Sequence, residues 1–231
     1  MSSLDEPVWC PALFQTRQGG ATAAIDVPMA TKLGTLEVSM ASAIGLDIVA
    51  DGWDLPGWER ELYPEDLPVD WRLTYFANEF PAVMLAAKYW LPAGEARLAA
   101  WSDDVPDGFR FYLEDAEPAA GREDLELARR LLGPKLAGLV RKAGADASSP
   151  ADGVARFRIL GEPAGLPGAG CLPAWRIPRP HIRDLRAGRA WLEGLCAQAP
   201  DSRGLLLLAG ADVGVDDLRR WWHLVWLLGL A

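Results

Sequence analysis

The fold of this chain is decided by residues 46–52, Leu-Asp-Ile-Val-Ala-Asp-Gly, where a short apolar run ends at an Asp-Gly pair. Short apolar runs that are closed by turn residues are typical of buried strands. Downstream, apolar residues from Leu73 to Phe80 recur at helical spacing, and Asp70 stands where a helix N-cap is expected. The domain therefore opens with a strand, a turn and a helix.

The same rhythm continues to the end of the chain. Strands are expected over 82–87, 109–114, 135–140, 154–160 and 205–208, with helical stripes between several of them. Residues 161–180 contain five prolines and predict a loop. Alternating strands and helices imply a parallel sheet. Five or six strands rather than eight predict an α/β fold in residues 45–231, a TIM-like β/α barrel that is incomplete or shortened. Residues 1–44 lack periodicity and are read as an N-terminal extension of unclear role.

Composition restricts the class of protein. The chain has 231 residues, half of them apolar, which suits one large domain. A net charge of −9 without a basic stripe argues against nucleic acid as a partner. The apolar windows at 205–210 and 221–231 are too short to span a membrane, and no secretory signal opens the chain. Three scattered cysteines form a poor disulfide framework, so a cytoplasmic location is expected.

Two tryptophan-rich motifs carry a resemblance. Residues 52–64 fit the pattern G-W-x4-W-x4-Y-P, and residues 101–111 fit W-x4-P-D-G-F-x-F. Together with the helical segment between them, these motifs resemble the domain of unknown function 72 (YecE-like) family. The resemblance implies a TIM-like barrel and no particular reaction. In such barrels functional side chains stand at the carboxyl ends of the strands.

At those strand ends the chain departs from the pattern of the family. The second strand of the family reads V-E-I-N-S-T-F-Y, whereas residues 83–90 read Val-Met-Leu-Ala-Ala-Lys-Tyr-Trp. Glu114 replaces a lysine at the end of the third strand, and Leu160 replaces a histidine two residues after Arg158. Because these changes remove proton carriers and hydrogen-bond donors, the sequence predicts a binding or interaction protein, a possible pseudoenzyme.

The alternative hypothesis is an enzyme on a small phosphorylated or sugar-like metabolite. Its candidate catalytic residues are Asp51, Lys88, Glu114 and Arg158. Each has a structural explanation as well. Lys88 and Glu114 could form a surface ion pair, Asp51 could serve its Asp-Gly turn, and Arg158 could pair within the fold. The enzyme hypothesis requires the four side chains to converge on one pocket.

Three aromatic residues after the first strand, Trp53, Trp58 and Tyr63, are candidates for binding a ligand or for closing the barrel mouth by packing. His181 and His223 stand far apart without companion ligands, so neither a metal site nor another cofactor is expected. The expected partner is an unknown small molecule or a protein, with no role for nucleic acid or membrane. The oligomeric state is left open.

Overall fold

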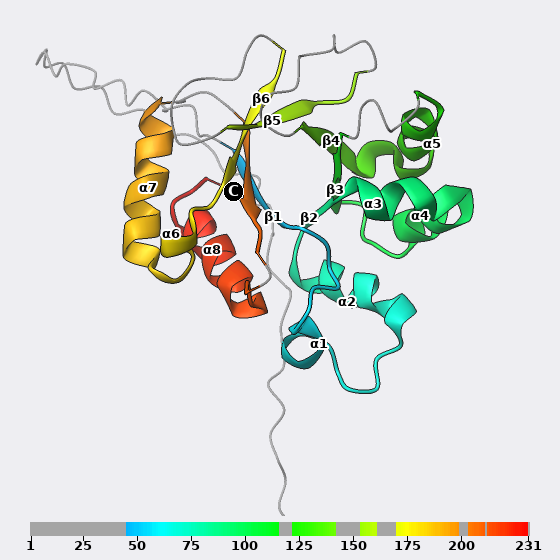
Figure 1. Ribbon diagram of the computed structural model, residues 1–231, viewed down its shortest axis with the longest axis horizontal. Helices are drawn as coiled ribbons and strands as arrows, with labels where there is room; N and C mark the ends of the chain where they lie inside the picture. Colours follow the sequence, from blue (N-terminus) through cyan, green and yellow to red (C-terminus); the bar gives the residue numbers. More distant parts are fainter. Residues whose placement is uncertain are drawn as a thin grey trace, which may run out of the picture. The chain divides into compact units, whose positions relative to one another are not determined.

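The computed structural model describes residues 45–115, 122–141, 153–160, 170–198, 203–210 and 212–230. All of them lie in the second of the two units into which the chain divides, Met40–Ala231. This unit is built around a seven-stranded sheet in which all neighbouring strands are parallel, in the order β1-β7-β6-β5-β4-β3-β2 (Figure 1). The strands are β1 Leu46–Ala50, β2 Ala82–Leu85, β3 Arg110–Glu114, β4 Leu136–Arg141, β5 Arg156–Leu160, β6 Leu172–Arg176 and β7 Gly204–Leu208.

The sheet curls into a nearly closed barrel. β1 pairs with β7 along its whole length, while a single parallel bridge between Asp51 and Met84 connects it to β2. The shortened TIM-like barrel expected from the sequence is confirmed, with seven described strands instead of five or six. The strand that was missed is β6, which lies inside the predicted proline-rich loop. Pro173 is tolerated because it stands near the start of β6, before the pairing with β7 begins at Ala174.

The interior of the barrel is filled by side chains. Tyr112 and Phe157 meet edge to face near its centre, with ring centroids 5.3 Å apart. Aliphatic residues such as Val49, Met84 and Leu205 surround them and are almost fully buried. Alternation along each strand therefore sends one set of side chains into the barrel and the other toward the helices. The described residues that point into the barrel form a packed core.

The amino-terminal end of the barrel is closed by a charged network around Asp47. Its carboxylate accepts a hydrogen bond from the Tyr112 hydroxyl and forms ion pairs with Arg110 at 2.6 Å and Arg203 at 3.4 Å. Burial, and then the negative charge of Asp47, raise the pKa of the Tyr112 hydroxyl. Asp47 therefore connects residues of β1 and β3 with Arg203, which precedes β7.

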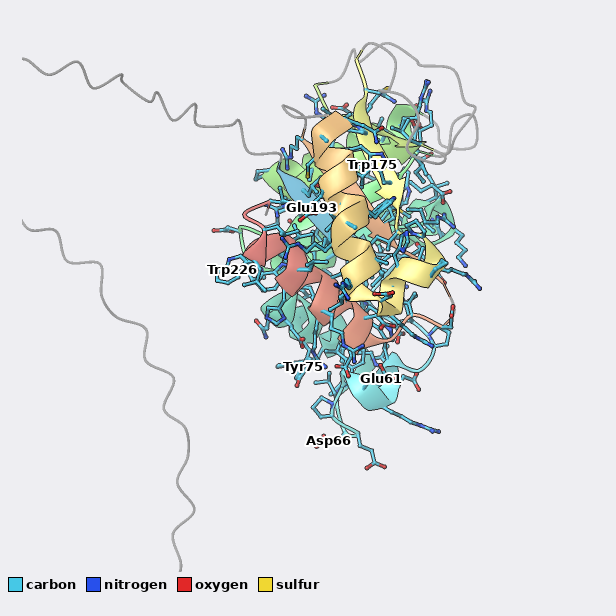
Figure 2. All side chains as sticks on the ribbon, turned by 90° about the vertical axis from the view of Figure 1, so that its left-hand side faces the viewer. Glu61, Asp66, Tyr75, Trp175, Glu193 and Trp226 are labelled. Atoms are coloured by element: carbon cyan, nitrogen blue, oxygen red, sulfur yellow. The ribbon has the colours of Figure 1, made fainter. Side chains whose placement is uncertain are left out.

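Helices pack on the outside of the barrel. α6, α7 and α8 lie together on one side, and α1 to α5 lie on the other (Figure 1). Figure 2 shows α7 and α8 side by side, with Trp226 at the exposed end of α8. The helices are α1 Trp58–Glu61, α2 Arg72–Glu79, α3 Ala87–Trp90, α4 Gly94–Asp103, α5 Arg122–Leu132, α6 Arg179–Arg183, α7 Leu185–Gln198 and α8 Val215–Leu227, with 3-10 turns at Val69–Trp71, Leu91–Ala93 and Gly133–Lys135.

Two local predictions need correction. Asp70 does not cap α2: it lies inside the 3-10 turn Val69–Trp71, and α2 begins at Arg72 without a side-chain cap. The apolar stripe from Ile182 to Cys196 predicts a helix with a break at Gly188, but Gly188 lies within α7 and the break falls at Asp184, between α6 and α7. The proposed extension, residues 1–44, lies outside the described residues. Within the described part of the chain, no helix is long and apolar enough to cross a membrane.

Candidate ligand-binding site

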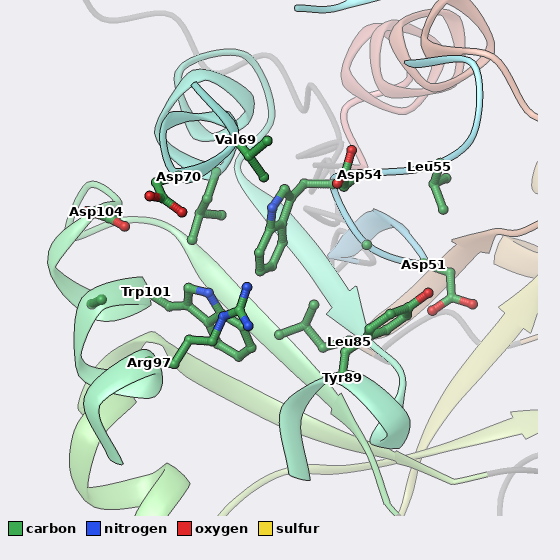
Figure 3. A pocket seen from close by; sticks show the side chains of 14 residues that line it. Asp51, Asp54, Leu55, Val69, Asp70, Leu85, Tyr89, Arg97, Trp101 and Asp104 are labelled. Atoms are coloured by element: carbon green, nitrogen blue, oxygen red, sulfur yellow. The ribbon is translucent and has the colours of Figure 1, made fainter. Parts of the chain in front are cut away.

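A pocket of about 480 Å³ lies beside the carboxyl end of β1 (Figure 3). Pockets that bind metabolites usually span about 300 to 1,000 Å³, so this one has room for a small organic molecule. Four parts of the chain form its wall: residues 51–55 after β1, three residues around the start of α2, the end of β2 with the following α3, and one face of α4. The contributions of the second and third parts are Val69, Asp70, Leu73, Leu85 and Tyr89. Carboxyl ends of parallel strands are where α/β barrels hold ligands.

The face of α4 that lines the pocket follows helical spacing. Arg97, Ala100, Trp101 and Asp104 stand at i, i+3, i+4 and i+7, so they project from one side of the helix or its end. Leu98 and Trp101 both pack in the core and are 1% and 7% exposed, which anchors the helix. Trp101 is thus shared between the core and the pocket wall, while Arg97 and Ala100 are exposed beside it.

Aromatic rings form much of the wall. Trp53 stands edge to face against Trp101, with ring centroids 5.3 Å apart and planes at 83°. Tyr89, from α3, is 52% exposed and lies at the pocket edge, and Leu85 forms part of the floor. Figure 3 shows the Trp101 indole and the Arg97 guanidinium turned toward the same space. Such a wall offers flat apolar surfaces to a ligand.

The loop that carries Trp53 is held from behind. Gly52 has φ 104°, a conformation that glycine adopts at low cost and that turns the chain sharply after β1. The Tyr63 hydroxyl donates to the Trp53 carbonyl, and burial, followed by the charge of Asp54, raises the pKa of that hydroxyl. The Trp58 indole donates to the Val213 carbonyl at 2.9 Å. The loop is thereby fixed before any ligand arrives.

The three aromatic residues that the sequence singled out for ligand binding thus occupy different positions. Trp53 lines the pocket. Trp58 is 0% exposed and Tyr63 is 5% exposed, and both pack in the core. In this geometry Trp53 is the one that can touch a ligand in the pocket, while Trp58 and Tyr63 position the loop that presents it.

The pocket wall carries more negative than positive charge. Its ionisable residues are Asp51, Asp54, Asp70 and Asp104 against Arg97. Asp54 is engaged by Arg72, with 2.5 Å between its carboxylate and the guanidinium. Asp70 and Asp104 make no ion pair with any residue that the structure describes. Sequence reasoning missed both, because Asp70 looks like a helix cap, and the pair Asp103 and Asp104 has the composition of a turn.

The four residues of the enzyme hypothesis are distributed as follows. Asp51 lines the pocket, whereas Lys88, Glu114 and Arg158 are not part of its wall. The Lys88 ammonium lies 4.6 Å from the centre of the Tyr89 ring. One oxygen of Glu114 accepts a hydrogen bond from the Ala87 amide at 2.9 Å, at the first residue of α3. Arg158 is half-buried on β5.

The residues that stand in place of the family's polar strand-end residues take part in packing or in local hydrogen bonds. Met84 is buried in the barrel interior, and Leu160 packs against the outer core. Ala86 precedes α3, whose first amide is bound by Glu114, and the Trp90 indole of that helix donates to the Glu114 carbonyl at 3.0 Å. Glu114 thus ties α3 to the end of β3. Among the residues that the structure describes, no group of three His, Cys, Asp or Glu side chains could jointly hold a metal ion.

Comparisons with other proteins agree with this architecture. Residues 48–128 match the family model "Protein of unknown function DUF72". That segment runs from the third residue of β1 past the end of β3 and includes every residue of the pocket wall. No curated protein matches the chain.

The chain is also similar to solved structures of DUF72 family proteins. A DUF72 family protein of Thermotoga maritima aligns with 11% identity and a TM-score of 0.50, covering 78% of this chain and 99% of the other. One from Enterococcus faecalis aligns with 11% identity and a TM-score of 0.48, covering 80% of this chain and 96% of the other. At 11% identity, the match to the Thermotoga structure indicates a similar fold only. Residues 48–128 are thus similar to the DUF72 family, and the parallel barrel of this chain is similar to the fold of the Thermotoga protein.

Proposed function

We propose that this protein binds a small organic ligand in the pocket beside β1 and does not transform it. The observation that carries the proposal is the pocket itself, an aromatic-walled space of about 480 Å³ fixed by a preformed loop. A rigid concave site with aromatic walls and a few polar groups is the usual form of a small-molecule site. Preorganisation of the wall lowers the entropic cost of binding.

The alternative hypothesis, that the protein is an enzyme, has less support. It requires Asp51, Lys88, Glu114 and Arg158 to act together, and Asp51 is the member of that set that lines the pocket. Glu114 is engaged in holding the amide of Ala87. General acid–base catalysis needs groups within hydrogen-bond reach of the reacting atoms, and three of the four candidates do not line this pocket.

A thermal-shift screen with a matched pair of variants tests the proposal. Ala100 lines the pocket and Ala96 lies on the same helix outside the wall, and both are exposed. We expect a ligand at about one hundred times its Kd to stabilise the protein by about 2.7 kcal/mol. Ala100→Trp should abolish that shift by filling the pocket, and Ala96→Trp should leave it intact.

The panel should contain organic amines, sugars and phosphorylated metabolites, and each hit should be incubated with the protein and analysed by mass spectrometry. The expected result is an unchanged ligand. A panel without any hit, or a shift that survives Ala100→Trp, would contradict binding in this pocket. Formation of a product that stops in Ala100→Trp would contradict the non-catalytic assignment and favour the enzyme.

A further inference from the structure

We infer that the ligand of this pocket is an organic cation, an ammonium or guanidinium group carried on an apolar body. The inference rests on the proposed function and names the class of ligand that the same pocket takes. It is carried by three separate features: the charge of the wall, the helix end that contributes to it, and the cations that its aromatic rings already hold.

The first feature is the charge balance of the wall. Among the described residues of the wall, Arg97 is the one cation, against four aspartates. With Asp54 engaged by Arg72, Asp70 and Asp104 still contribute negative charge with no ion-paired partner in the described part of the chain. Carboxylates that converge on a concave site with apolar walls focus a negative potential there. A bound cation would lower the repulsion between these groups, and an anion would increase it.

The second feature is the end of α4. Asp104 is the C-cap residue of this helix, and Asp103 is its last residue. Negative charge at a helix C-terminus is unfavourable because the helix dipole is already negative there. Lys135, which is not part of the pocket wall, binds the carbonyls of Ser102 at 2.6 Å and Val105 at 2.8 Å. Asp104 is left facing the pocket, where a ligand cation would compensate both its charge and the dipole.

The third feature is that two aromatic rings of the wall already contact cationic side chains. The Arg97 guanidinium lies over Trp101, 5.9 Å from the ring centre, and the Lys88 ammonium lies over Tyr89 at 4.6 Å. Both cationic side chains are exposed. The faces of these rings therefore accept a guanidinium and an ammonium group in the free protein. Aromatic faces flanked by carboxylates are the usual recognition elements for organic cations.

The apolar part of the wall defines the rest of the ligand. Leu55, Val69, Leu73 and Leu85 line the same space as Trp53. A bare metal ion would leave these surfaces without contact, whereas an alkyl or aryl group would cover them. A sugar could stack on Trp53, but its binding would not depend on the charge of the wall. A phosphorylated metabolite would meet the aspartates with like charge.

Substitution of Arg97 distinguishes these classes of ligand, because the change in affinity has a different sign for cations and anions. The Arg97 guanidinium occupies the aromatic face that a ligand cation would use, and it repels that cation. Arg97→Gln should therefore strengthen the binding of a cation, leave a sugar nearly unaffected and weaken the binding of an anion. Asp70→Asn combined with Asp104→Asn should act in the opposite direction for each charged class.

The experiment is isothermal titration calorimetry with phenethylammonium, its uncharged N-acetyl analogue, agmatine, glucose and glucose 6-phosphate. We expect phenethylammonium or agmatine to bind and the N-acetyl analogue to bind at least tenfold more weakly. Arg97→Gln should raise the affinity for the cation about threefold. The double variant with Asp70→Asn and Asp104→Asn should lower that affinity about tenfold at low salt. Arg186→Gln removes an exposed charge on α7, outside the wall, and should change neither value.

The outcomes separate this inference from the proposed function. If neither cation binds, but glucose or glucose 6-phosphate binds and Ala100→Trp abolishes that binding, the inference of a cationic ligand is wrong. The proposal that the pocket binds a ligand then stands. Cation binding that weakens in Arg97→Gln also overturns the inference of a cationic ligand. Absence of binding for all five probes in a folded protein contradicts both proposals.

Discussion

Two sides of the barrel use tryptophan in opposite ways. Where α7 meets α8, Trp221 is 0% exposed, its indole donates to the Ile182 carbonyl at 3.0 Å, and its ring touches the backbone of α7 at Gly188. Where α4 faces the loop after β1, Trp53 and Trp101 make one edge-to-face contact beside a pocket of about 480 Å³. One side is closed by its own side chains and the other is open.

The difference separates packing from recognition. A barrel of this size gains stability by excluding voids, and the α7–α8 contact does so. The wall of the pocket keeps aromatic surface accessible and collects carboxylates around it, which costs stability and is retained where a site needs it. Variants of matched chemistry on the two sides should therefore have different effects on stability, and those effects test the contrast.

The largest effect is expected from truncating the buried tryptophan. Trp221→Ala should lower the free energy of unfolding by about 3 to 5 kcal/mol, because it leaves a cavity and an unsatisfied Ile182 carbonyl. Trp53→Ala should lower it by about 1 kcal/mol, the size of one aromatic pair contact. Urea unfolding followed by circular dichroism measures both. Similar losses for the two variants would mean that the pocket side is packed as tightly as the α7–α8 side.

Two glycines of α7 give a smaller contrast of opposite sign. A Cβ atom at Gly188 would lie 2.9 Å from the Trp221 ring, whereas one at Gly194 would meet nothing within 4 Å. Gly188→Ala should destabilise the protein by about 1 to 3 kcal/mol through overpacking. Gly194→Ala should stabilise it by about 0.5 to 1 kcal/mol through helix propensity alone.

The melting temperatures of the two glycine variants suffice for this test. Both substitutions add the same methyl group to the same helix, so propensity cancels in the comparison and the contact with Trp221 remains. If Gly188→Ala also raised the melting temperature, α7 and α8 would not be as closely packed as their contact implies.

Sequence reasoning succeeded where the pattern of residues is local. The apolar runs that became β1 and β7 are bounded by turn residues and buried on both faces, so composition alone identifies them. The motif with Gly52 and Trp53 carries the family match. β6 was missed because Pro173 argues against an interior strand, and only its register with β5 and β7 shows that the missing amide is tolerated.

The pocket needed tertiary information for a different reason. The face of α4 with Arg97, Ala100, Trp101 and Asp104 has clear helical spacing, but its mixed charge does not look like an apolar stripe. Its meaning comes from the loop that carries Trp53, which lies far away in sequence. The expectation that Trp53, Trp58 and Tyr63 would act as a group could not anticipate that Trp58 and Tyr63 would lie behind the wall.

The smallest expected effect concerns two aspartates at opposite helix ends. Asp217 lies in the first turn of α8, where one carboxylate oxygen accepts the Gly214 amide at 3.1 Å and the side chain is 8% exposed. Asp104 is the C-cap of α4 at the pocket. Asp217→Asn should lower the free energy of unfolding by about 1 kcal/mol, since it removes a charge-assisted capping bond.

Asp104→Asn should instead raise the free energy of unfolding by about 0.3 to 1 kcal/mol, because it removes negative charge from the negative end of the helix dipole. Urea unfolding at low ionic strength measures both variants, and added salt should shrink the gain at Asp104 because solvent ions screen a partly exposed charge. We expect a carboxylate of a cation site to raise the affinity for the cation while it lowers the free energy of unfolding. A loss of stability in Asp104→Asn would instead assign this side chain to the fold, as Asp217 is assigned.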